Sequence, residues 1–156
     1  MSHFNEVSRL PAVILVLFVL NFLIFGAIYW YRSSPAMLGV AALVFLVGLL
    51  LVVVTLSVSI TPEGINYKLA PFHFNLRHWD WEQVQKAELL KISALADFGG
   101  WGLRYSKTHG CGYITQGDWG LKVKTSDGQK FVVSINRPEE LRRFLKEHHL
   151  ESRVVF

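Results

Sequence analysis

Two long apolar runs near the start of the chain, Pro11–Tyr29 and Met37–Val58, constrain its fold more than any other feature. Neither run contains a charged residue. A helix needs about 20 residues to cross the hydrocarbon core of a bilayer, and each run has that length. Only a short segment separates the runs, so the chain turns back directly. The sequence therefore predicts a transmembrane helical hairpin over residues 11–58, with spans at about 11–30 and 36–58.

The hairpin divides the rest of the chain into two parts. Residues 1–10 form a short polar N-terminal segment, which we expect to be frayed or to lie at the membrane interface. Residues 59–156 are enough for one small soluble domain with its own core. A cleaved signal peptide is the alternative for the first run, because Arg9 precedes it. That run is too long, lacks a small-x-small cleavage site and is followed at once by a second span, so we favour the hairpin.

The residues around the first span predict its orientation. Aromatic residues of the kind that settles among lipid headgroups end this span, and an arginine follows them. The residues that we assign to the membrane interface are Tyr29, Trp30, Tyr31 and Arg32. Two spans return the chain to the side on which it began, so Arg9 lies on the same side as the basic residues of the soluble domain. The positive-inside rule then favours a multi-pass protein with both termini in the cytoplasm. The polar residue inside this span, Asn21, predicts either a hydrogen bond to the neighbouring helix or a self-association contact.

The soluble part alternates apolar and polar residues with a period of two, which is typical of half-buried strands. Turn signals such as Ser126-Asp127-Gly128 separate these segments. The predicted strands are Leu56–Ile60, Ile65–Leu69, Gln85–Ile92, Trp101–Tyr105, Gly112–Thr115, Leu121–Lys124 and Phe131–Ile135, and Phe72–Leu76 alternates again. We expect Ala94–Gly100 to form a loop and Asp80 to cap a short turn.

The period changes after Ile135. Pro138 suits the first position of a helix, two glutamates follow it, and Asn136 or Arg137 takes the capping position. The helical stripe Leu141, Phe144 and Leu145 is apolar. The fold class that we predict is a membrane α-helical hairpin followed by a mostly-β domain. That domain has about seven antiparallel strands and is capped by a C-terminal α-helix.

Five short motifs in the soluble part are similar to those of a known family. They are Trp81-Glu82-Gln83-Val84, Gly99-Gly100-Trp101-Gly102-Leu103-Arg104, Gly117-Asp118-Trp119-Gly120-Leu121, Asp127-Gly128-Gln129-Lys130 and Arg137-Pro138-Glu139-Glu140-Leu141. The chain resembles the bacterial pleckstrin-homology-like (PH-like) small membrane proteins with two transmembrane helices, over most of Leu56–Leu145. The resemblance implies a PH-like domain that the hairpin anchors at the cell inner (plasma) membrane. PH-like folds often bind peptides or lipid headgroups, which is an analogy at the level of the fold.

Motifs for chemistry are absent or weak in the sequence. The glycine-rich stretch at Gly99 lacks the lysine and spacing of a phosphate-binding loop. His109 and Cys111 are two soft ligands, whereas a structural zinc site needs four. Neither residue has a carboxylate partner that would make it a nucleophile and base. Asp80 and Glu82 flank a tryptophan in a polar turn, where solvation is the favoured role. We therefore predict no enzyme, no metal and no cofactor.

The net charge of +4 is mildly basic and suits a surface near anionic lipid better than a nucleic-acid binder. The single cysteine excludes an intrachain disulfide. We expect a non-enzymatic interaction module, an adaptor or accessory subunit that presents a sheet edge or loop rim to a membrane protein partner, or that self-associates. An anionic lipid-headgroup binder or sensor is the first alternative, and a membrane enzyme of unknown reaction is the second. The candidate interaction surface consists of Trp101, Arg104, Trp119, Lys122 and Lys124.

Overall fold

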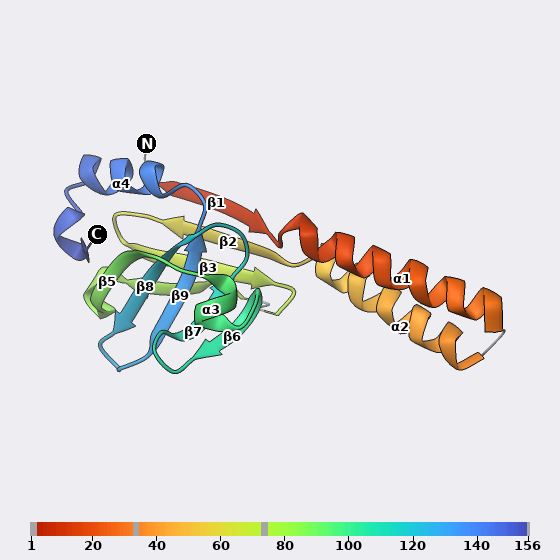
Figure 1. Ribbon diagram of the computed structural model, residues 1–156. Coiled ribbons are helices and arrows are strands. Elements are labelled where there is room, and N and C mark those ends of the chain that lie inside the picture. Colours follow the sequence, from red (N-terminus) through yellow and green to blue (C-terminus); the bar gives the residue numbers. More distant parts are fainter. Residues whose placement is uncertain (1–2, 33–34, 73–74, 156) are drawn as a thin grey trace. The chain divides into compact units, whose positions relative to one another are not determined.

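The structure is a computed structural model that describes residues 3–32, 35–72 and 75–155. The chain divides into two compact units (Figure 1). The helical unit is Leu10–Val54. The β unit combines Met1–Arg9 with Thr55–Phe156, so the N-terminal segment belongs to it.

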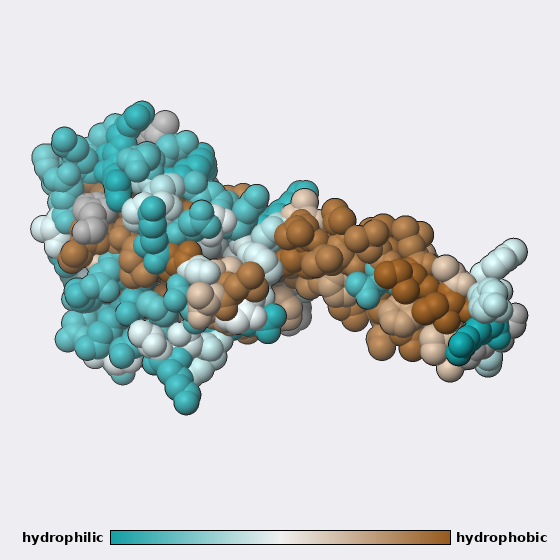
Figure 2. Space-filling model, in the orientation of Figure 1, coloured by the Kyte–Doolittle hydropathy of each residue, from teal (hydrophilic) through white to brown (hydrophobic). Residues whose placement is uncertain are grey.

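The helical unit consists of α1 (Ala12–Arg32) and α2 (Pro35–Val52), which pack against each other. Phe18 of α1 lies beside Gly48 of α2, and the rings of Phe22 and Phe45 lie 5.5 Å apart. The visible surface of the hairpin is almost wholly apolar (Figure 2). Both helices are long and apolar enough to cross a membrane, as the two runs predict.

Two details of the hairpin differ from the prediction. The second helix ends at Val52 rather than Val58, because the following residues alternate in burial and pair as a strand. The amide of Asn21 donates to the carbonyl of Leu17 in its own helix (2.8 Å), not to the neighbouring helix. The predicted turn residues Ser33 and Ser34 lie outside the described residues.

Sheet A has the strand order β1-β2-β3-β4, formed by Phe4–Arg9, Thr55–Ile60, Gly64–Ala70 and Arg77–Asp80. The expectation that the N-terminal segment is frayed or interfacial is wrong for β1, which pairs with the whole of β2. The strand β4 ends at Asp80, which caps the short 3-10 helix Trp81–Gln83, as predicted. The predicted alternating segment Phe72–Leu76 includes residues outside the described ones.

Sheet B has the order β10-β5-β8-β9-β7-β6 (Figure 1). Its strands are β5 (Val84–Lys91), β6 (Gly102–Ser106), β7 (Gly110–Ile114), β8 (Trp119–Thr125), β9 (Lys130–Ile135) and β10 (Val154–Val155). The described residues thus form ten strands, where about seven antiparallel ones were predicted. Two pairs, β7 with β9 and β10 with β5, run parallel.

The core lies between the inner faces of the two sheets. Tyr67 of sheet A contacts Tyr113 and Phe131 of sheet B, with ring centroids 4.8 and 4.9 Å apart. Burial raises the pKa of both tyrosines. A chain of buried hydroxyls also crosses the core, because Ser8 bonds Thr115 (2.6 Å) and Thr115 bonds Ser134 (2.9 Å).

The helix α4 (Pro138–Glu147) closes the β unit with its buried stripe of Leu141, Phe144 and Leu145. The capping residue is Arg137, but its side chain makes no capping hydrogen bond to the backbone and instead pairs with Glu140 in the first turn (2.9 Å). The buried carboxylate of Glu6 on β1 caps the helix start. It accepts hydrogen bonds from the backbone N–H groups of Asn136 (2.7 Å) and Arg137 (3.1 Å). A residue 130 positions away in the chain thus caps this helix.

The outer face of sheet B carries a second, smaller core under α3 (Ala94–Phe98), where a loop was predicted. The helix forms because the hydroxyl of Ser93 caps it by accepting a hydrogen bond from the N–H of Ala96. The carboxylate of Asp97 in turn accepts a hydrogen bond from the N–H of Ser93 (2.7 Å). Phe98 then packs with Ile92, Ile114 and Val132. The absence of a side chain at Gly112 makes room for the Phe98 ring, whose atoms lie 2.5 Å from where a Cβ would be.

Candidate functional site

The two tryptophans of the predicted surface have packing roles. Trp101 is half-buried against the small core under α3. Trp119 lies on the inner face of sheet B, where the cations of Lys91 and Arg142 sit 5.8 and 5.0 Å from its ring centroid. Trp119 and the predicted basic residues of β8 therefore face opposite sides of the sheet, and the five predicted residues do not form one surface.

Lys122 and Lys124 share the outer face of β8, as their alternation predicts. The register extends this pair into a row of three lysines across three adjacent strands. Lys124 lies directly opposite Lys86 of β5 on one side and opposite Lys130 of β9 on the other. We call Lys86, Lys124 and Lys130 the lysine row. Strand spacing places neighbouring members about 5 Å apart at the backbone.

Two of the three charges in the lysine row are uncompensated. Like charges directly opposite each other destabilise a sheet. Lys86 forms an ion pair with Glu88 on its own strand, and hydrogen bonding to Lys86 is the main cause that lowers the pKa of Glu88. Within the described part of the chain, Lys124 and Lys130 have no carboxylate within ion-pair distance. The row can attract an anion by charge alone.

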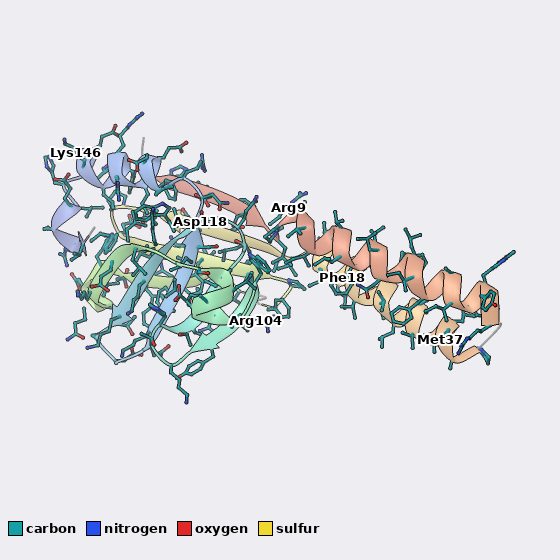
Figure 3. All side chains as sticks on the ribbon, viewed as in Figure 1. Arg9, Phe18, Met37, Arg104, Asp118 and Lys146 are labelled. Carbon is teal, nitrogen blue, oxygen red and sulfur yellow. The ribbon has the colours of Figure 1, made fainter. Side chains whose placement is uncertain are left out.

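Arg104, which is labelled in Figure 3, lies on β6. This strand is three positions from β8 in the sheet, so the predicted basic residues form two separate groups. Its Nε–H donates to the carbonyl of Trp101 (3.0 Å), which restrains the exposed guanidinium. No carboxylate among the described residues forms an ion pair with it. The neighbouring residues Leu103 and Tyr105 are 42% and 76% exposed.

Sequence reasoning missed Lys130, Leu103 and Tyr105 as surface features. The turn at Asp127 was a sufficient signal for the contact between Lys130 and Lys124, because a tight hairpin turn sets the register of its two strands. No local signal indicates that β6 ends the sheet, because strand order depends on contacts between distant segments.

The predicted interface residues lie at the end of α1. Trp30 and Tyr31 are 88% and 87% exposed, Tyr29 is 37% exposed, and Arg32 is the last residue of the helix. Their contact with lipid headgroups stays a prediction.

Other polar clusters in the β unit are small. His78 hydrogen-bonds Asn66 (2.6 Å) and Asp80 (2.8 Å) on the exposed side of sheet A. The ring of His109 packs against Phe98, with centroids 5.6 Å apart. In the ranges that the structure describes, no three or more His, Cys, Asp or Glu residues gather as they would around a metal ion.

The chain has no match among protein-family models and none among curated proteins. The candidate site therefore rests on its geometry: the lysine row on one face of sheet B, and the exposed residues of β6 at its edge.

Proposed function

We propose that the protein is a membrane-anchored, non-enzymatic interaction module. The hairpin of α1 and α2 crosses the inner membrane, both termini lie in the cytoplasm, and the β unit is a PH-like domain that binds a protein partner. Two packed sheets and a C-terminal helix support the PH-like assignment. The observation that carries the proposed function is β6, which ends sheet B with Leu103 and Tyr105 exposed on one face. Exposed apolar and aromatic side chains at one place are typical of protein-binding surfaces.

Purification of the tagged full chain in mild detergent tests this proposal. We expect a membrane protein to copurify in stoichiometric amount, and to be lost from the double variant Leu103→Ala, Tyr105→Ala. The matched control is Val7→Ala, because Val7 is also an exposed apolar strand residue (68%) but lies in sheet A. Recovery of the chain alone, or equal recovery of the partner with the double variant, would contradict the proposal.

The lysine row supports a second candidate function, the binding of anionic lipid headgroups. Each lysine close to an anionic surface contributes about 1 kcal/mol, so three in one row would orient the domain strongly. The full chain is needed for the test, because a fragment that begins at Thr61 would lack β1 and β2.

Lysine acetylation of the full chain in nanodiscs measures this contact directly. In anionic nanodiscs, Lys124 and Lys130 should react several-fold more slowly than in neutral ones, and high salt should remove the difference. Lys146 on α4 is the exposed control and should react equally in both. Equal protection of all lysines, or none, would exclude the headgroup-binding function.

A further inference from the structure

We propose that the free edge of β6 receives an extended segment of the partner protein, which adds to sheet B as a further strand beside Leu103–Tyr105. This inference rests on the proposed function and names the form of the partner. It predicts that the partner is recognised by its backbone as well as by its side chains.

The other sheet edges offer less to an incoming strand. The described strands leave four edges, at β1, β4, β10 and β6. Strand β10 has two residues and β4 has four. The edge of β1 is partly covered, because the Arg137 guanidinium bonds the carbonyl of Asn5 and α4 packs beside this strand. The remaining edge, β6, has five residues and pairs with β7 on one side, and the short helix α3 also contacts this strand.

The backbone of an edge strand carries its own recognition chemistry. In an antiparallel pair, alternate residues direct both their N–H and their C=O away from the partner strand. The five residues of β6 therefore present such groups on the side away from β7. These groups can pair with an extended segment, and the charge of Arg104 disfavours a basic segment at this edge while it favours an acidic one.

The side chains of β6 specify what the segment carries. Leu103 and Tyr105 share one face, in register with Tyr113 and Cys111 of β7, and Arg104 projects from the other face. A segment that fits has apolar residues on the first face and an acidic residue opposite Arg104. A second copy that paired antiparallel about the middle of β6 would instead place Arg104 opposite its own counterpart, which is repulsive.

Three synthetic peptides test the inference on the full chain in detergent micelles. The probe is acetyl-Thr-Val-Glu-Val-Thr-amide. One control replaces its Glu with Lys, and the other carries N-methyl groups on both Val residues and on Glu, which removes backbone donors directed to either side of the peptide. Affinity is measured by titration, and amide hydrogen exchange is measured over Gly102–Ser106. We expect the probe to slow exchange in this segment and the N-methylated peptide to fail to do so.

Charge reversal gives a second, independent readout. A cross-strand charge pair changes affinity by up to about fivefold, so the probe should bind better than the Lys peptide by that factor. In the variant Arg104→Glu this preference should invert. The control Lys122→Glu changes the same face of sheet B away from the edge and should leave the preference unchanged.

Three outcomes would overturn strand addition. They are equal binding of the N-methylated peptide, no change in exchange over β6, and crosslinking of β6 to β6 of a second copy. If a stoichiometric partner still depends on Leu103 and Tyr105, the proposed function survives and only strand addition fails. If binding of the partner also proves independent of Leu103 and Tyr105, both the proposed function and strand addition fail.

Discussion

The cap that Glu6 places on α4 predicts a large effect from a residue close to the N-terminus. Only 4% of Glu6 is exposed, and its two carboxylate oxygens accept separate backbone N–H groups at the start of the helix. The substitution Glu6→Ala leaves both donors without this partner. Hydrogen bonds to a charged acceptor contribute about 1.5 kcal/mol or more each, so we expect a loss of about 3 kcal/mol. Glu6→Gln keeps one acceptor and should lose about half as much.

Thermal unfolding of the full chain in detergent, followed by near-ultraviolet circular dichroism, measures this loss. At about 4 °C per kcal/mol for a domain of this size, Glu6→Ala should lower the melting temperature by about 12 °C. The matched control is Asn5→Ala, because Asn5 is the exposed neighbour on β1 and contributes its backbone carbonyl, which alanine keeps. The reasoning is refuted if Glu6→Ala melts within about 2 °C of this control.

Three further predictions follow from the two cores. Burial raises the pKa of Tyr67 and Tyr113 above the ordinary 10.0, so these phenols should be the last to ionise in an alkaline titration at 295 nm, and substitution of either by Phe should remove a late-titrating phenol. The stability that the two neutral phenols contribute should be present below pH 10 and should fall as the pH rises above it. Gly112→Ala should cost about 1–3 kcal/mol by displacing α3, measured by chemical denaturation, whereas Gly39→Ala, where a Cβ meets nothing, should not destabilise. Thr115→Val should cost about 1–2 kcal/mol in the same assay, because it breaks the buried hydroxyl chain at its middle, and an unchanged midpoint would contradict that role.

The parts of the fold that were predictable depend on local signals. Two uncharged runs suffice for the hairpin, because length and hydropathy are properties of a single segment. The turn at Asp127 and the proline at the start of α4 also act locally, and the structure confirms both elements. The strands β2, β3 and β8 follow from simple alternation, and β5 and β9 from short apolar stretches next to turn signals.

The parts that were missed depend on distant contacts. The strand β1 alternates, but it buries the polar Glu6 and Ser8 and exposes Val7, which is the reverse of the usual pattern. Burial of Glu6 is acceptable only because the start of α4 satisfies it, and no local signal shows this. The helix α3 has five residues, too few for a periodic pattern, although Ser93 and Asp97 were available as a capping signal.

The candidate surface was predicted only in part for the same reason. Lys122 and Lys124 share a face, which alternation alone indicates. Their pairing with Lys86 depends on the register between β5 and β8, which are separated by α3 and two further strands in the chain. Trp119 was predicted to share a surface with these lysines, whereas it lies on the opposite face of β8, where its ring contacts the cations of Lys91 and Arg142.

Photo-crosslinking from β6 in native membranes tests the central claim most directly. A benzophenone amino acid replaces Tyr105 in the full chain, and a control variant carries it at Glu63, an exposed turn residue of sheet A. The account predicts one dominant crosslinked product between position 105 and another membrane protein, and none from position 63. Equal labelling from both positions, or no protein product from position 105, would contradict a protein-binding edge at β6.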